Sequence, residues 1–117
     1  MPGTIPRNSR FEARVRSQTA QTTLTPNIDA NEQERVTGLT AGITIANPTG
    51  TPLDGQRLLV KIKDNGVARA IAWGSIYRAA TGAGLPNITT AGKLHRLLLE
   101  YDSTDAKWDL IATSTET

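Results

Sequence analysis

The sequence predicts an all-β fold: a single antiparallel β-sandwich or barrel, jelly-roll-like, with an extended N-terminal arm. Three observations support this prediction. Strand-length apolar runs recur between turn signals, no segment beyond the arm shows a convincing helical period, and basic charge gathers at one end. At 117 residues the chain has the length of one domain, with residues 1–23 as the arm and residues 24–117 as the β-domain.

The arm is predicted from charge and from backbone-restricting residues. Residues 1–16 carry a side-chain charge of +3, and because the net charge of the chain is +2, the remainder carries −1. Pro2, Gly3 and Pro6 keep the start extended, and the polar run that follows has no apolar stripe. Two interpretations stay open, a solvated tail or an arm that binds another surface. The residues expected to make contact are Arg7, Arg10, Phe11, Arg14, Val15 and Arg16.

After the arm, short apolar or Thr-rich runs alternate with segments rich in Gly, Pro, Asn and Asp. This pattern is typical of strands connected by turns. The expected strands cover residues 19–25, 35–39, 43–46, 57–64, 67–73, 76–80, 94–101 and 107–113, and residues 47–55 form a turn-rich loop.

The most regular stretch is "RLLVKIKDNGVARAIAW", residues 57–73, which predicts a β-hairpin turning at Asn65 and Gly66. A two-residue type I′ turn would pair Leu58 with Trp73, whereas a bulged turn would shift this register by one residue. Either turn needs a positive φ at Gly66. The type I′ register places on one face, as core residues, Leu58, Val60, Ile62, Ile71 and Trp73; the other face, with Leu59, Lys61 and Lys63, is thin and partly basic.

A second hairpin is expected from residues 94–101 and 107–113, around the turn "DSTDA". Its first strand is apolar on both faces, which indicates either a central strand buried on both sides or a surface for self-association. The candidate self-association residues are Leu97, Leu99, Tyr101 and Trp108.

Composition argues against most chemical functions. The chain has no cysteine, and its only histidine, His95, lies in a strand pattern without a recognisable nucleophile as partner. Asp102 and Asp105 have the spacing of turn residues and offer too few oxygen ligands for calcium. No catalytic residue, metal site or cofactor is therefore expected, and the protein is not expected to be an enzyme. No apolar run approaches the length of a membrane span, so a membrane partner is not expected.

Nucleic acid is also a poorly supported partner. The arm offers only about three or four phosphate contacts, which would give weak and salt-dependent binding. Phe11 is its sole aromatic residue, so stacking platforms are scarce.

Two stretches, "DGQRLLVKIKDNGVARAIAWGSIYRA" and "GLPNITTAGKLHRLLLEYDSTDAKWDLIAT", resemble a small β-domain of structural proteins from tailed bacteriophages and prophages. The shared elements fall at residues 57–73, 85–89 and 101–108, and the resemblance covers residues 34–114. It is fairly specific for a virion protein and poorly specific for the part of the virion.

The resemblance implies a structural role in a symmetric particle. The leading hypothesis is a capsid decoration, or cement, protein on the outer surface of the phage head. Its partner would be the major capsid protein, its arm would clamp neighbouring capsid subunits, and particle symmetry favours a homotrimer. The alternative is a tail-fibre or baseplate module that contacts host-surface glycans.

Overall fold

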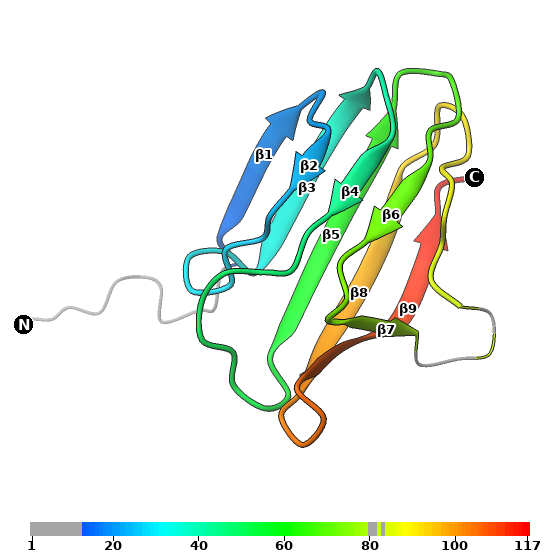
Figure 1. Cartoon of the computed structure of the whole chain (residues 1–117). Helices are drawn as coiled ribbons and strands as arrows, with labels where there is room; N and C mark the ends of the chain where they lie inside the picture. The colour runs from blue at the N-terminus through cyan, green and yellow to red at the C-terminus, as the bar shows by residue number, and fades with distance from the viewer. Residues whose placement is uncertain (1–12, 80–81, 83) are drawn as a thin grey trace, which may run out of the picture.

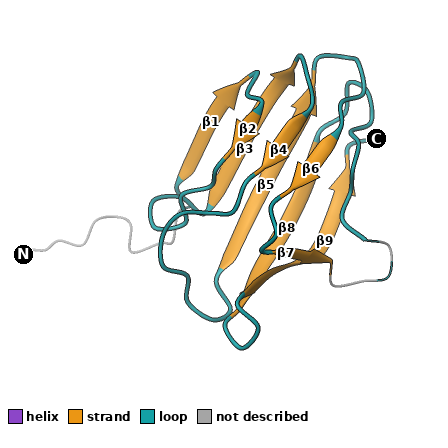
Figure 2. Cartoon of the chain, viewed as in Figure 1, coloured by secondary structure: helices purple, strands orange, loops and turns teal. Residues whose placement is uncertain are grey.

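The computed structural model describes residues 13–79, 82 and 84–117, and these residues form an all-β sandwich (Figures 1 and 2). Six strands form one sheet in the order β1-β3-β5-β8-β9-β7, and three form a second sheet in the order β2-β4-β6. The strands are β1 (Val15–Thr19), β2 (Thr23–Leu24), β3 (Gln33–Leu39), β4 (Ile43–Ile45), β5 (Arg57–Asp64), β6 (Ile71–Trp73), β7 (Tyr77–Ala79), β8 (His95–Asp102) and β9 (Lys107–Thr115). The predicted all-β class is thus confirmed.

The strand directions differ from the antiparallel arrangement expected. Over the first six strands the chain alternates between the sheets, so that β1, β3 and β5 pair in parallel, as do β2, β4 and β6. Parallel neighbours need a long crossover, and here each crossover includes a strand of the opposite sheet. The sandwich is therefore mixed: among the strands of the described residues, β5–β8 and β8–β9 are the antiparallel pairs.

The predicted hairpin over residues 57–73 is wrong in its pairing. Its two halves are β5 and β6, which belong to different sheets: Leu58 pairs with Leu99 of β8, and Trp73 pairs with Ile45 of β4. The intervening residues 65–70 carry the chain across the sandwich. Gly66 does adopt the expected positive φ, 101°, and its N–H donates to Asp64 Oδ1 at 2.9 Å, closing a local turn.

The core lies between the sheets and contains the side chains predicted for it on β5. Leu58, Val60 and Ile62 are fully buried and Ile71 is nearly so, while Trp73 is half-buried. The alternation of β5 therefore gave the correct inward face although its partner was misassigned. The buried apolar set is completed by Leu24, Ile28, Val36, Leu39, Ile43, Ile45, Tyr77, Leu97, Leu99, Trp108 and Leu110.

The second hairpin is confirmed. β8 and β9 are antiparallel, and Tyr101 pairs with Trp108 as the turn position requires. A register shift between Leu98 and Leu99 marks a bulge in this pair. β7, which precedes β8 in the chain, lies on the other side of β9 and pairs with it in parallel.

The parallel pairing of β4 with β6 can be tested by crosslinking. Thr44 and Ala72 are exposed cross-strand partners, and neighbouring strands lie about 4.8 Å apart, within the Cα separation that a disulfide spans. We expect the variant carrying Thr44→Cys and Ala72→Cys to form an intramolecular disulfide on mild oxidation, detected by mass spectrometry.

The matched control combines Leu59→Cys with Ala72→Cys, the partners that a β5–β6 hairpin would bring together. This second variant should stay reduced because its cysteines lie on different sheets. Crosslinking of the control in preference to the first variant would contradict the topology.

Candidate docking surface

The end of the predicted arm belongs to the sheet. β1 pairs in parallel with β3, from Val15 opposite Gln33 to Thr19 opposite Thr37. An edge strand exposes many of its side chains, so it needs no apolar stripe to form, and β1 is accordingly polar and half-exposed. The predicted arm of residues 1–23 therefore includes a strand of the sheet, β1, and in this part the predicted boundary is wrong. The predicted contact residues Arg7, Arg10 and Phe11 lie outside the described residues.

Arg14, immediately before β1, is held by several hydrogen bonds. Its Nε donates to Glu32 Oε2 at 2.8 Å, its backbone N–H donates to Glu32 Oε1 at 2.8 Å, and its Nη1 donates to the Asp29 carbonyl at 3.1 Å. The backbone N–H groups of Glu32 and Gln33 both donate to the Arg14 carbonyl. The side-chain hydrogen bond from Arg14 lowers the pKa of the Glu32 carboxyl, although burial opposes this shift.

Arg16 is used inside the fold. Its Nε lies 2.6 Å from Oε1 of Glu34, a carboxylate with no solvent exposure, and its Nη2 donates to the Thr25 carbonyl at 2.8 Å. Glu34 Oε2 also accepts the N–H of Asn27 at 3.0 Å. Arg16 therefore neutralises a buried charge, while 37% of its side chain stays exposed, and its predicted capsid contact stays a prediction. Val15, between the two arginines, is 49% exposed.

Glu32 and Glu34 are the anchoring residues that sequence reasoning missed. Arg14 and Arg16 are two residues apart, and so are Glu32 and Glu34, as strand partners with matching alternation would be. This repeated spacing was the available signal.

The residues predicted for self-association lie mostly in the core. Leu97 and Leu99 are fully buried and Trp108 is 1% exposed, because this side of β8 and β9 faces the second sheet. Tyr101 is half-buried, with its ring centroid 5.2 Å from that of Trp108. These side chains therefore stabilise the monomer fold, and three of the four are inaccessible to a second copy.

The opposite side of the six-stranded sheet, here called the outer face, is open to a partner. Leu59 and Leu98 are half-buried partners on β5 and β8, and Ala112 follows on β9. Together with Arg96, Thr113 and Ser114 they line a shallow hollow of about 120 Å³. The second, outward set of apolar residues noticed in the sequence of β8 thus lies on this face.

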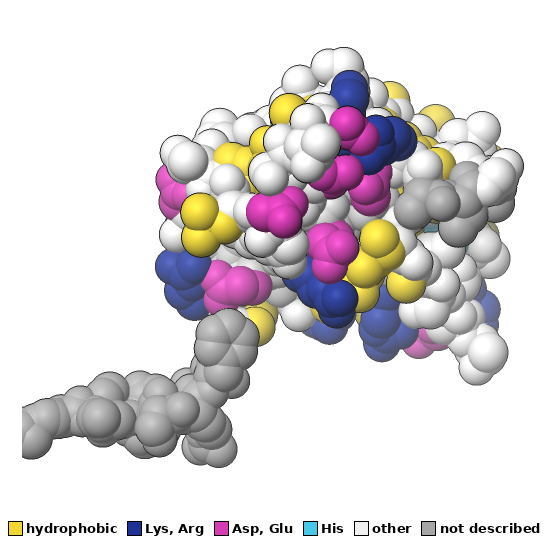
Figure 3. Space-filling view, turned by 90° about the horizontal axis from the view of Figure 1, so that it is seen from below, with side chains coloured by type: hydrophobic (Ala, Val, Ile, Leu, Met, Phe, Trp, Pro, Cys, Tyr) yellow, Lys and Arg dark blue, Asp and Glu magenta, His cyan; other side chains and the backbone are white. Residues whose placement is uncertain are grey.

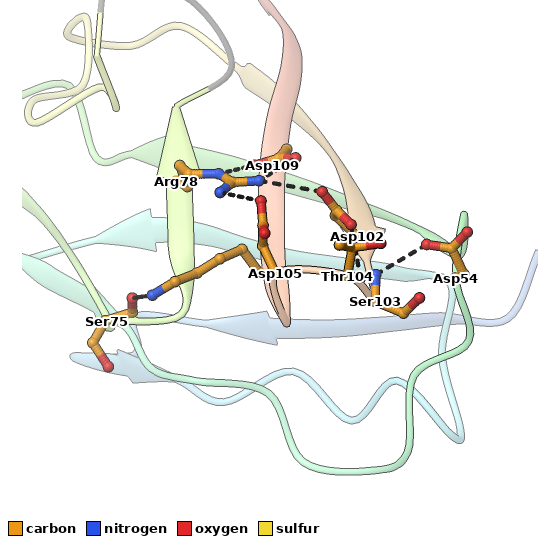
Figure 4. A network of polar contacts seen from close by, with 9 residues as sticks. Asp54, Ser75, Arg78, Asp102, Ser103, Thr104, Asp105 and Asp109 are labelled. Atoms are coloured by element: carbon orange, nitrogen blue, oxygen red, sulfur yellow. Dashed lines mark hydrogen bonds and ion pairs between the residues drawn. The ribbon is translucent and has the colours of Figure 1, made fainter.

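Acidic side chains gather at the end of the molecule where β1 begins (Figure 3). Part of this group surrounds Arg78 of β7 (Figure 4). Arg78 Nε donates to Asp109 at 2.6 Å, Nη1 to Asp105 at 2.9 Å and Nη2 to Asp102 at 3.4 Å. The hydrogen bonds to Asp109 and then Asp105 raise the pKa of Arg78, and all three contacts tie β7 to the β8–β9 hairpin.

His95 and Asp64 form a structural polar network. Asp64 is 3% exposed; its burial opposes ionisation, but hydrogen bonds from Thr89, Gly92 and Gly66, and the nearby His95, lower its pKa overall. The Thr90 N–H lies 2.7 Å from His95 Nε2, and His95 Nδ1 lies 3.2 Å from Thr115 Oγ1. Both groups are used to hold loops.

The part of the chain that the structure describes contains no group of three or more metal-ligating side chains, and no helix in it is long and apolar enough to cross a membrane. Comparison with protein-family models, with curated proteins and with solved structures found no match.

The structural role of Arg16 predicts the effect of replacing it. Arg16→Met leaves the buried Glu34 carboxylate without its counter-ion, so the free energy of unfolding should fall by about 3 kcal/mol. Chemical denaturation measures this change. Adding Glu34→Gln should restore part of the loss because it removes the unpaired charge.

The matched control is Arg57→Met, which breaks an exposed ion pair with Glu100 and should cost no more than about 1 kcal/mol. Equal losses in Arg16→Met and Arg57→Met would show that Arg16 is a surface residue without a structural role.

Proposed function

We propose that this chain is a decoration protein of a tailed bacteriophage, located on the outer surface of the head, where it binds the major capsid protein and stabilises the shell. The resemblance of residues 34–114 to a virion β-domain supports this proposal. The structural observation that carries it is the anchoring of Arg14, immediately before β1, to Glu32 and Asp29 at the edge of the sandwich.

In this proposal the basic segment grips neighbouring capsid subunits. Arg7 and Arg10 would pair with acidic patches on the shell, and Phe11 would be an apolar contact. Fixing each backbone residue of the segment on the shell costs roughly 1–2 kcal/mol in entropy, so several contacts must act together. Because Arg14 is hydrogen-bonded to Glu32 and Asp29, a force on the segment is transmitted to the folded domain at this point. Exposed Val15 extends the contact to the first residue of β1.

We also propose a homotrimer placed on the symmetry axes of the shell, which follows from particle symmetry. The contact between copies would have to use surfaces other than Leu97, Leu99 and Trp108, since these are buried.

The tail-fibre or baseplate alternative draws less support from the side chains. Glycan recognition commonly uses exposed aromatic rings, but the four aromatic residues within the described ranges are buried or half-buried. They pack in two pairs, Trp73 with Tyr77 and Tyr101 with Trp108. The head therefore stays the favoured location.

The proposal predicts that residues 1–12 are needed for binding to the shell. Heads prepared without this protein would be mixed with the full-length chain or with a chain lacking residues 1–12, and bound protein would be measured after sedimentation. We expect the deletion to weaken binding at least tenfold and to leave the unfolding temperature unchanged, because β1 and Arg14 are retained.

A deletion of residues 1–23 would be a poor test because it also removes β1. The matched control is the full-length chain carrying Arg57→Gln, which alters charge away from the segment. Equal binding by the full-length and deleted chains would contradict the arm mechanism, and antibody labelling of the tail instead of the head would contradict the location.

A further inference from the structure

Three cations stand side by side on the outer face. Arg35 of β3 pairs in register with Lys61 of β5, and Lys61 pairs with Arg96 of β8. Residues in register share a face, and neighbouring strands are about 4.8 Å apart, so this basic row spans roughly 10 Å. We use "basic row" for these three residues.

No member of the basic row belongs to an ion pair among the described residues. The cations of those ion pairs are Arg14, Arg16, Arg57, Lys63 and Arg78. The Nε of Arg35 is shielded from solvent and has no hydrogen-bond partner among these residues. Like charges placed directly opposite one another destabilise a sheet. Desolvation, and then the charges of Arg35 and Arg96, lower the pKa of Lys61.

The other charges around the basic row are already paired. On one side Arg57 Nε lies 3.2 Å from Glu100 Oε2, and on the other Lys63 Nζ lies 3.9 Å from Glu116 Oε1. These two flanking cations of β5 are therefore neutralised, whereas no member of the row belongs to an ion pair.

An apolar row lies beside the basic row, on the neighbouring outward positions of β5 and β8, and continues onto β9. Leu59, Leu98 and Ala112 follow one another in register across β5, β8 and β9. Arg96 lines the same hollow as these three side chains. A cationic strip is thus joined to an apolar one on a single open sheet face, a combination typical of protein interfaces, in which Arg is enriched.

We propose that the outer face binds an acidic segment of a partner protein, whose carboxylates pair with Arg35, Lys61 and Arg96 while an apolar side chain enters the hollow beside Leu59 and Leu98. Guanidinium groups match carboxylates in geometry, and three cations suit two or three carboxylates. A nucleic acid is a poorer fit because its phosphates continue past the row, where Arg57 and Lys63 are already paired with Glu100 and Glu116. The interaction does not depend on the segment before β1.

The test uses a short probe peptide in which Glu alternates with Leu and Thr, and the same peptide with Gln in place of Glu. Binding to the ¹⁵N-labelled full-length protein is followed by NMR titration. We expect the Glu peptide to shift amides of β3, β5 and β8, to bind more weakly as salt is raised, and to bind at least tenfold more tightly than the Gln peptide.

The decisive variant carries Lys61→Gln and Arg96→Gln and should bind the Glu peptide about tenfold more weakly than the wild type. The matched control carries Arg57→Gln and Lys63→Gln, the same loss of charge from the same face, and should bind within about threefold of the wild type. The unfolding temperature of the decisive variant should equal or exceed that of the wild type, because repulsion between like charges is removed.

Several results would overturn the proposal. These are the absence of shifts on the outer face, equal weakening in both variants, or a lower unfolding temperature in the decisive variant, which would indicate a structural role for the row. Tighter binding of oligothymidylate would assign the face to nucleic acid. Self-association lost only in the decisive variant, measured by sedimentation, would assign it to a second copy of the chain.

Discussion

Over the first six strands the chain reverses direction each time it crosses to the other sheet (Figure 1), so strands that become neighbours within a sheet run parallel. This constraint determines which residues meet. It places β5 between β3 and β8, at the centre of the larger sheet, and brings Ile43 beside Ile71 in the smaller one. The antiparallel hairpin of β8 and β9 then extends the larger sheet, and β7 completes its far edge.

The same arrangement separates the two faces of the larger sheet. Its inner face supplies most of the core, where even the charged residue Glu34 is buried against Arg16. Its outer face keeps three adjacent cations without internal partners among the described residues. Buried charge is neutralised inside the fold, whereas these outward cations are not, and this contrast is the basis for our proposal that the outer face is a docking surface.

The features that could be predicted from the sequence are local. Alternation along β5 identified Leu58, Val60 and Ile62 as core residues, and the short turn between β8 and β9 correctly predicted their pairing. The positive φ of Gly66 was also predictable, since this backbone conformation favours glycine.

The features that could not be predicted depend on long-range pairing. An Asp-Asn-Gly turn is equally compatible with a hairpin and with a crossing to the other sheet, and only the packing of β6 against β4 separates the two. β1 was assigned to the arm because an edge strand can be polar throughout, and its partner β3 lies more than ten residues further along the chain. The basic row was invisible for the same reason: Arg35, Lys61 and Arg96 are far apart in sequence and meet only through sheet register.

We propose that this sandwich attaches to a phage head through the segment before β1 and the outer face of its larger sheet. The most direct measurement is a cryo-electron microscopy map of heads saturated with the protein. We expect density for the sandwich on the exterior of the shell, with residues 1–12 extending over a neighbouring capsid subunit. We also expect Lys61 and Arg96 to face carboxylates of the capsid. A map in which the outer face points to solvent, or in which the protein decorates the tail, would contradict it.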